Sequence, residues 1–456
     1  MNQIAFSQPC SVFSLWISWF WVMFATSLIS CSGGGGGTST YTIGGTVSGL
    51  TGGSLALKNN GGDALTIASN STSFTFASTQ TSGAVYSVTV GSQPNGLTCS
   101  VSNGSGSISS ASISNVNVVC KSQFVYVPNR DTFPTFTVSM YTISPSTGIL
   151  TSFSPSTVTD SNLNSPIAIA VNPAGTFAYV VNYFSSTVSM FSVNSSTGAL
   201  TALNPASVST DPSGGAANAN STSIAINPAG TFAYVVNHYT NNVSMFAINT
   251  STGILSPLST PSVPSGNDPR WISINPAGTF AYVINYADST LTIYSIGIDG
   301  ILTAVSTIST GAGPSYIAIH PGGNYAYVTN STSNSISILN LQNNSVIGTV
   351  LTGNGPTQIA INSTGTNAYV VNTNSNTVSM YSLGSDGSLI PLSTATIATG
   401  ATPVSIGINP SGAYAYVSNS GDNTVSMYLI NSSTGTLSAL GTPVATGTTP
   451  FFMAIK

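Results

Sequence analysis

The sequence predicts an all-β protein in which a small β-sandwich precedes a seven-bladed β-propeller. A phrase of the form Tyr-Val-x-Asn recurs at intervals of 42 to 55 residues, which is the spacing of propeller blades built from short β-runs. No stretch beyond the first thirty residues has a sustained helical period. The tyrosines of the phrase are Tyr126, Tyr179, Tyr234, Tyr282, Tyr327, Tyr369 and Tyr416.

The first thirty residues predict a secretory signal of the lipoprotein type. An apolar stretch over residues 12–29 ends in Leu-Ile-Ser-Cys, and small residues before a cleavage point are typical of such signals. The ending resembles a lipobox, in which Cys31 is lipidated and becomes the mature N-terminus; residues 31–40 are then a glycine-rich tether. No Lys or Arg precedes Lys58, so the usual basic region is missing. A misassigned start codon and an uncleaved anchor are the alternatives.

Residues 41–121 predict the small β-sandwich. Short β-runs alternate there with Gly, Asn and Ser turns. Cys99 and Cys120 are the only cysteines after Cys31, and an even pair in an exported domain predicts a disulfide. We interpret this domain as a spacer, with a binding role as the alternative.

Residues 122–456 predict the propeller. Blade four shows four short β-branched or aromatic runs, separated by Asn-Pro-x-Gly and x-Gly turn signals. Blade one lacks the Pro-x-x-Ile-x-Ile run that opens the other blades, and a matching run stands at the other end of the chain, residues 450–455. The C-terminus therefore predicts the innermost strand of blade one, which closes the ring and leaves no unpaired edge at the seam.

On these residues the chain resembles the YVTN-repeat and lactonase-like seven-bladed propellers of bacteria, over residues 122–456. The resemblance implies the propeller fold. It implies an activity only loosely, because that family contains sugar-lactone hydrolases, muconate-cyclising relatives and surface or periplasmic proteins without an assigned role.

Composition narrows the class of partner. Lys and Arg together number 5, Asp and Glu together 9, all of them Asp, and the formal net charge is −4. This excludes the basic surface that nucleic-acid binding needs. No P-loop, H-E-x-x-H, G-x-S-x-G or clustered Cys/His ligand pattern occurs, so we expect neither cofactor nor metal. We expect a monomer whose partner is a small molecule, a glycan or an envelope protein.

The few reactive side chains mark a candidate ligand site on one face of the propeller. They follow the Asn of the recurring phrase in blades one to four or enter the first strands of blades four and five. Aromatic rings with a few polar groups around a central pit are typical of small-molecule sites. The alternative is local pairing of Arg130 with Asp131 and of Arg270 with Asp268. The candidates are Arg130, Asp131, Tyr183, Phe184, His238, Tyr239, Asp268, Arg270, Trp271, Tyr286, Asp288 and Tyr316.

Two functions remain open. The preferred one is an exported, lipid-anchored binding or surface-scaffold module of the cell envelope, as an outer-membrane lipoprotein facing the periplasm or the cell surface. The alternative, implied by the resemblance, is a hydrolase that opens a sugar-type lactone. Such a reaction needs a base and an oxyanion donor, for which His238, Arg130 and Arg270 are the candidates. The other histidine, His320, replaces the Asn of an Asn-Pro turn and is interpreted as a turn residue.

Overall fold

The computed structural model describes residues 39–456 except 52, 95–96, 131–134, 145–146 and 212–218. The predicted signal over residues 1–30, the lipidation site Cys31, Asp131 and most of the tether lie outside the described residues. Within the described ranges every regular element is a strand, and none of these residues forms a helix of the length and apolarity that a membrane span requires.

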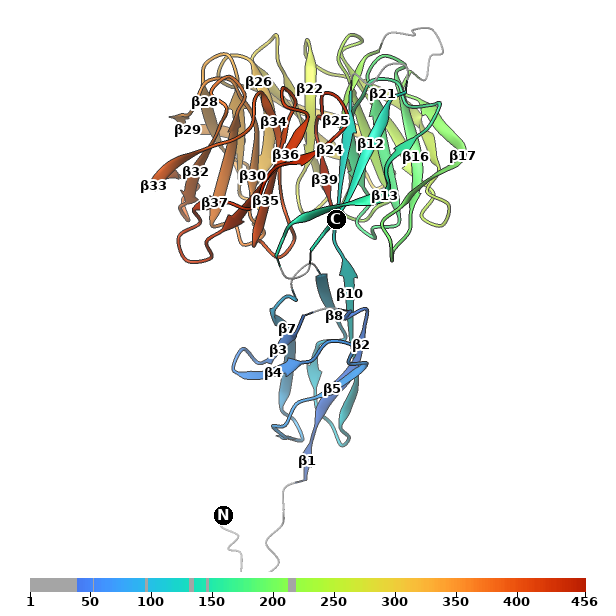
Figure 1. Cartoon of the computed structure of the whole chain (residues 1–456), viewed down its shortest axis with the longest axis vertical. Helices are drawn as coiled ribbons and strands as arrows, with labels where there is room; N and C mark the ends of the chain where they lie inside the picture. Colours follow the sequence, from blue (N-terminus) through green and yellow to red (C-terminus); the bar gives the residue numbers. More distant parts are fainter. Residues whose placement is uncertain (1–38, 52, 95–96, 131–134, 145–146, 212–218) are drawn as a thin grey trace, which may run out of the picture. The chain divides into compact units, whose positions relative to one another are not determined.

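The residues after the predicted tether form a β-sandwich, as the sequence predicts (Figure 1). Two four-stranded sheets enclose one apolar core, and β1 (Thr40–Tyr41) pairs with β6 (Gln80–Thr81). The predicted disulfide is confirmed: Cys99 and Cys120 lie directly opposite each other on neighbouring strands and are bonded. One sheet has the order β5 (Ser73–Thr75), β2 (Ile43–Ser48), β10 (Ile113–Ser122), β8 (Leu97–Ser102), and the other β4 (Asp63–Ile67), β3 (Leu55–Asn59), β7 (Val85–Ser92), β9 (Ser105–Ser107).

Seven further antiparallel sheets form the blades of the propeller (Figure 1). In the first four the strands run from the innermost to the outermost as follows. Blade one is β39 (Ala454–Ile455), β11 (Phe124–Asn129), β12 (Thr137–Ile143), β13 (Leu150–Thr159); blade two is β14 (Pro166–Val171), β15 (Phe177–Asn182), β16 (Thr187–Val193), β17 (Leu200–Ser209); blade three is β18 (Ser221–Ile226), β19 (Phe232–Asn237), β20 (Asn242–Ile248), β21 (Leu255–Pro264); blade four is β22 (Pro269–Ile274), β23 (Phe280–Asn285), β24 (Thr290–Ile296), β25 (Leu302–Ser309).

The last three blades repeat this order, with a shorter outer edge in blade seven. There the outermost strand is divided in two pieces that both pair with the third strand. Blade five is β26 (Pro314–Ile319), β27 (Tyr325–Asn330), β28 (Ser335–Asn340), β29 (Ser345–Leu351); blade six is β30 (Pro356–Ile361), β31 (Asn367–Asn372), β32 (Thr377–Leu383), β33 (Leu389–Ala398); blade seven is β34 (Pro403–Ile408), β35 (Tyr414–Asn419), β36 (Thr424–Ile430), β37 (Leu437–Ala439) and β38 (Val444–Ala445).

The predicted ring closure is confirmed. Strand β39 pairs antiparallel with β11, with Ile455 opposite Val125, and the Phe124 amide donates to the carbonyl of Lys456 at 2.6 Å. The paired part is shorter than the six-residue run suggests. The Phe452 amide donates at 3.2 Å to the carbonyl of Ile167 in blade two, so this part of the segment crosses between two blades before it joins blade one.

The recurring Tyr-Val-x-Asn phrase connects strands within a blade and blades to one another. Its Asn is buried, and the side-chain amide donates to hydroxyl or amide oxygens of the third strand, as Asn182 does to Thr187 and Ser189 at 3.0 and 2.9 Å. Its Tyr hydroxyl donates to a turn-glycine carbonyl of the next blade, and burial raises the pKa of that hydroxyl. Six such bonds are described: Tyr126–Gly198, Tyr179–Gly253, Tyr234–Gly300, Tyr327–Gly387, Tyr369–Gly435 and, across the seam, Tyr416–Gly148.

Candidate functional site

The same backbone framework occurs seven times around the central axis and sets out the candidate site. The residue before each innermost strand is left-handed, and its carbonyl accepts the amide of the residue that follows the phrase's Asn, as Asp268 does from Tyr286 at 2.8 Å. We call these acceptors the hinge ring and their donors the outer ring. The hinge ring is Ser165, Asn220, Asp268, Gly313, Gly355, Thr402 and Thr449; the outer ring is Arg130, Tyr183, His238, Tyr286, Ser331, Thr373 and Ser420.

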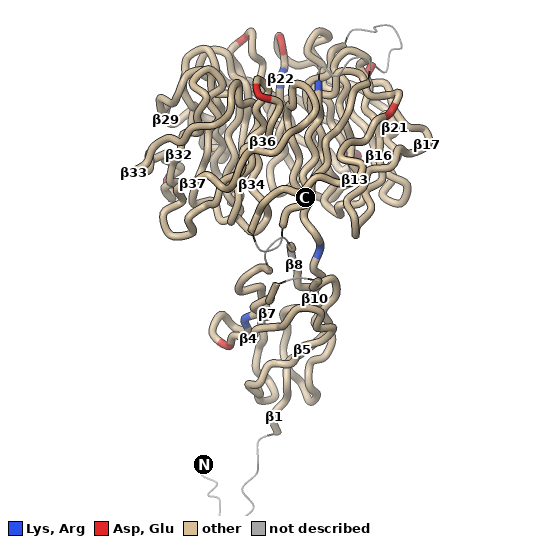
Figure 2. The backbone as a smooth tube through the Cα atoms, in the orientation of Figure 1, with Lys and Arg blue, Asp and Glu red and all other residues tan. Residues whose placement is uncertain are grey.

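An inner ring is formed by the second residue of each innermost segment. Its members are Ile167, Thr222, Arg270, Ser315, Thr357, Val404 and Phe451. Six of these seven, all but Val404, line a pocket of about 250 Å³, together with Phe452 and the outer-ring residues Arg130, Tyr183 and His238. Both arginines of the chain and one of its two histidines therefore meet in one cavity. In Figure 2 most visible charged positions of the propeller lie toward one end of the blades.

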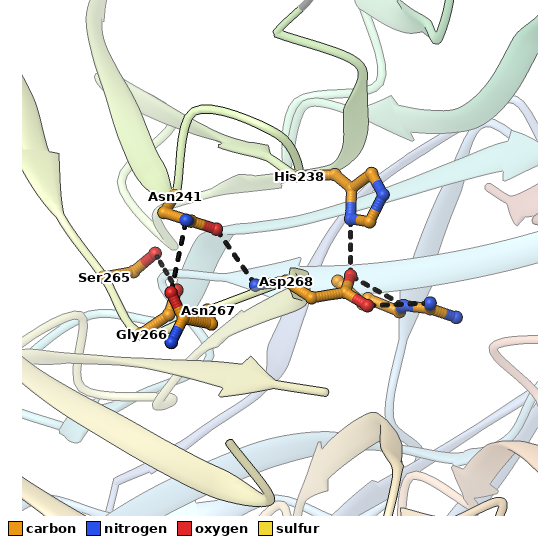
Figure 3. Close-up of polar contacts among 7 residues, drawn as sticks. His238, Asn241, Ser265, Gly266, Asn267 and Asp268 are labelled. Atoms are coloured by element: carbon orange, nitrogen blue, oxygen red, sulfur yellow. Dashed lines mark hydrogen bonds and ion pairs between the residues drawn. The ribbon is translucent and has the colours of Figure 1, made fainter. Parts of the chain in front are cut away.

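Asp268 connects His238 and Arg270. Its carboxylate is in contact with His238 Nδ1 and accepts two bonds from Arg270, from Nε and from Nη2, each 2.9 Å long (Figure 3). The Arg270 guanidinium also lies over the Tyr286 ring, 3.7 Å from its centre, where a cation is attracted to the aromatic face. The alternative pairing of Arg270 with Asp268 is thus present, and it includes the histidine as well.

Opposing effects set the acidity of Asp268. Partial burial favours the neutral acid, but hydrogen bonds from His238 and Arg270 and the charge of Arg270 favour the carboxylate more strongly, so the pKa of Asp268 lies below its usual value. The carboxylate is therefore ionised at neutral pH. An ionised acceptor at Nδ1 fixes the proton of a neutral imidazole on that nitrogen and leaves Nε2 as the basic one.

The loop that carries Asp268 is held by neighbouring side chains. Asn241 accepts the Asp268 amide at 2.9 Å and donates to the Asn267 side chain at 3.3 Å (Figure 3). Asp288 accepts the amide and the side-chain nitrogen of Asn267 at 2.7 and 2.8 Å. Other blades use the same bond from the hinge amide to an Asn side chain; for example, the Thr402 amide donates to Asn376 Oδ1 at 2.8 Å. The backbone position of Asp268 thus recurs in the other blades, whereas a carboxylate occurs at this position only in blade four.

Aromatic rings surround Arg130 on the far side of the pocket. Its guanidinium lies 5.2 Å from the centre of the Tyr183 ring and 5.5 Å from that of Phe451. The Tyr183 ring in turn stacks on His238, with centres 6.4 Å apart. Tyr183 therefore stands between the guanidinium of blade one and the imidazole of blade three.

Three rings form a floor below the pocket. Trp271 packs against Tyr316 and Phe452 with ring centres 4.4 and 4.7 Å apart. Trp271 and Tyr316 also line a second cavity of about 480 Å³, bounded largely by aliphatic side chains of innermost strands β22, β26 and β30. Phe452 lines the first pocket, so this aromatic cluster borders both cavities, of which only the first is lined by charged side chains.

The remaining predicted site residues lie around the pocket. Phe184 and Tyr239 are exposed and cover Tyr183 and His238, with ring centres 5.2 and 4.4 Å apart. Asp288 serves the loop described above, and Asp131 lies outside the described residues. His320 accepts the amide of Gly322 through Nδ1 at 3.0 Å, which confirms its interpretation as a turn residue.

Sequence reasoning missed several residues that line the pocket: Ile167, Thr222, Ser315, Thr357, Phe451 and Phe452. A signal for all six was available, because five of them occupy the position of Arg270 in the aligned repeats and Phe452 occupies that of Trp271. Ser and Thr are so frequent here that composition does not single them out, and the two phenylalanines were assigned only to the closing strand. Among the described residues, no three His, Cys, Asp or Glu side chains are grouped so as to hold a metal ion.

Comparison with known proteins supports the fold at the level of a family. A family model described as a seven-bladed β-propeller lactonase matches residues 88–205, 135–307 and 300–454. No curated protein matches the chain.

Solved structures share the propeller. A candidate 6-phosphogluconolactonase from Bacteroides uniformis has a TM-score of 0.63 at 18% identity, and the match covers 73% of this chain and 99% of the other. A periplasmic gluconolactonase from Pseudomonas aeruginosa has a TM-score of 0.63 at 15% identity, with the same coverage of both chains. At these identities the similarity shows a common fold.

Proposed function

The chain belongs to the family of seven-bladed β-propeller lactonases, and on that premise we propose that it hydrolyses a sugar-type lactone in the pocket between Arg130 and His238. The carrying observation is the contact of His238 with the ionised Asp268 at the wall of this pocket. A carboxylate on one imidazole nitrogen holds the proton there and leaves the other nitrogen to accept a proton from water. This favours the hydrolase over the binding module that composition alone favours.

The residues suit lactone opening as follows. His238 Nε2 takes a proton from water as the water oxygen attacks the lactone carbonyl, and Arg130 stabilises the negative charge that develops on the carbonyl oxygen. The ring C–O bond then breaks, and the imidazolium returns the proton to the departing alkoxide. Water is consumed, and the product is the open hydroxy acid. Arg270 does not touch the reacting atoms in this scheme, because it holds the carboxylate of Asp268.

The test is hydrolysis of glucono-δ-lactone by the purified protein. The reaction is measured as the rate of acid release above the spontaneous rate. We expect His238→Ala to lower kcat/KM by about 10²–10⁴-fold, the usual contribution of a general base. His320→Asn is the matched control and keeps wild-type activity, because Asn is the residue that other blades have at this turn. Unchanged turnover in His238→Ala contradicts the assignment of the base.

A second candidate is a module that binds such a molecule without turning it over. The pairing of Arg270 with Asp268 favours this candidate, because Arg270 is then not in a position to stabilise the negative charge that lactone opening develops. Ligand binding without acid release above the spontaneous rate would select this candidate.

We also propose that the protein is exported and held at the membrane of the cell envelope by lipid on Cys31, as a monomer that acts on a small molecule. The sequence supports this through the Leu-Ile-Ser-Cys ending of the apolar segment and the glycines that follow. Glycan or envelope-protein partners are the alternatives.

Fractionation of cells tests the anchor. We expect Cys31→Ser to move the protein from the membrane to the soluble fraction, because the acylated thiol is lost, while Cys10→Ser, a second cysteine of the same segment, changes nothing. A Cys31→Ser protein that stays in the membrane fraction points instead to an uncleaved apolar anchor.

A further inference from the structure

The inner ring divides the pocket into an apolar and a polar half. Going around the axis, blades one and two contribute Phe451 and Ile167 to the pocket, next to Val404 of blade seven, which belongs to the ring but does not line the pocket. Blades three to six contribute Thr222, Arg270, Ser315 and Thr357. Each half is an unbroken arc of neighbouring blades. A ligand that fills this pocket therefore meets an aromatic and aliphatic wall on one side and hydrogen-bonding groups on the other.

One polar group of this wall has an unused hydrogen-bonding capacity. Thr222 Oγ1 is buried and has no hydrogen-bond partner among the described residues. Its neighbours in the arc are engaged: Ser315 Oγ donates to the Pro356 carbonyl at 2.8 Å, and Thr357 Oγ1 bonds the Thr373 hydroxyl at 2.9 Å. Buried polar groups in proteins are nearly always paired. The unpaired Thr222 hydroxyl therefore suits a hydrogen bond to a hydroxyl group of a ligand, either direct or through a water.

The charges of the pocket do not suit a phosphate group. Arg270 donates from the Nε and Nη2 edge of its guanidinium to the Asp268 carboxylate, and one face of the guanidinium lies on Tyr286. Arginine binds phosphate through that same planar fork. A phosphate dianion would have to displace Asp268 or lie close to its negative charge. No lysine lines the pocket in the part of the chain that the structure describes, and the proposed reaction places the other arginine of the pocket, Arg130, on the lactone carbonyl oxygen.

Resting on the proposed lactonase function, we propose that the pocket takes an unphosphorylated polyhydroxylated lactone and discriminates against the 6-phosphorylated form. In this arrangement the C–H face of the lactone ring lies on Phe451 and Ile167. The hydroxyls of the lactone reach the polar arc from Thr222 to Thr357. The pocket's volume of about 250 Å³ lies below the roughly 300–1,000 Å³ of sites for drug-sized ligands, which agrees with a single sugar ring.

Hydrolysis kinetics provide the first test. We expect kcat/KM to be at least about tenfold higher for glucono-δ-lactone than for its 6-phosphate, since one unfavourable charge contact is worth about a factor of ten or more. Thr222→Val keeps the side-chain shape and removes the hydroxyl. This substitution should raise KM for glucono-δ-lactone several-fold. The KM for δ-valerolactone, which has no hydroxyl, should stay unchanged. Preference for the phosphorylated lactone overturns the proposal.

Equilibrium binding separates this proposal from the hydrolase itself. Gluconate and 6-phosphogluconate are added to the full chain, and the fluorescence of Trp271, which packs on the pocket residue Phe452, is followed. The Trp271→Phe variant subtracts the signal of the three tryptophans near the N-terminus. Tighter binding of gluconate supports the selectivity even if no lactone is hydrolysed, a result that would refute only the hydrolase. Tighter binding of 6-phosphogluconate, or no Trp271-dependent change with either, refutes the selectivity.

Discussion

At the scale of single residues, Asp268 combines a structural and a chemical task. Its φ of +53° belongs to the left-handed region, which costs most non-glycine residues about 1–2 kcal/mol but is tolerated best by Asp and Asn. All seven blades use this conformation before the innermost strand. Only in blade four does the residue there carry a charge, and that charge holds both His238 and Arg270.

Asp268→Asn isolates that charge, because Asn adopts the same backbone conformation. We expect kcat to fall by about 10²-fold or more, as the imidazole loses the acceptor that fixes its tautomer, while the fold persists. The pH-rate profile and circular dichroism check the two parts of this expectation. A variant with wild-type kcat would show that the carboxylate does not position His238.

We expect the stability of the wild-type protein to depend on pH through Asp268, and comparison with Asp268→Asn tests this. The pKa of Asp268 is lowered in the folded protein, so the carboxylate stabilises the fold at pH values above its usual pKa near 3.8 and this contribution is lost as the pH falls below it. The melting temperature of Asp268→Asn should therefore lie below that of wild type at pH 7 and approach it below about pH 4. A constant gap at all pH values contradicts the linkage.

The rarity of charged residues and histidines in this chain decided which site residues could be predicted. Arg130, His238 and Arg270 stand out because the chain has so few charged groups. Thr222 resembles dozens of other Ser and Thr residues, and its unpaired hydroxyl is visible only when its surroundings are known. The contact between His238 and Asp268 joins two blades, and no local pattern reveals it.

At the scale of elements, the turn before the outermost strand depends in six of the seven blades on a glycine that supports the neighbouring blade; blade five has Asn344 in this turn. Gly253 has a φ of +76°, its carbonyl accepts the Tyr179 hydroxyl at 2.8 Å, and the Phe177 ring lies where a side chain would extend. The x-Gly signals in the sequence predicted the turns. The packing of a ring from the preceding blade on the glycine required the assembled structure.

We expect Gly253→Ala to lower the free energy of unfolding by about 2–5 kcal/mol, the sum of a left-handed alanine and an overpacked ring. Chemical denaturation measures this change. Gly412→Ala is the matched control: its φ is +74° and nothing lies within 4 Å of the added carbon, so only about 1–2 kcal/mol should be lost. Equal effects of the two substitutions would show that the Phe177 contact is unimportant.

At the scale of the whole molecule, the closing segment at residues 450–456 serves both fold and site. It supplies β39, whose residues pair with β11, and it supplies Phe451 and Phe452 of the pocket. The repeat predicted the closure because the missing run of blade one stands at the other terminus. It could not predict that the phenylalanines line the pocket, because the segment crosses to blade two at Phe452.

Deletion of residues 450–456 should abolish cooperative folding or cause aggregation, since it exposes the inner edge of β11 and removes buried apolar groups. Thermal melting and size-exclusion chromatography provide the measurement. Phe451→Leu is the control: it keeps the strand and the melting transition but weakens substrate binding. A truncated protein with the wild-type melting temperature would show that the ring does not need this strand.

The late position of β39 in the chain has a consequence for biogenesis. Val125 and Ile455 pair across 330 residues, so blade one is synthesised first and completed last. During synthesis the propeller is an open arc of blades whose first member lacks its inner strand, and such non-local pairing is slow to form. A product that ends before residue 450 keeps that open edge. The propeller can therefore close only after residues 450–456 have been synthesised.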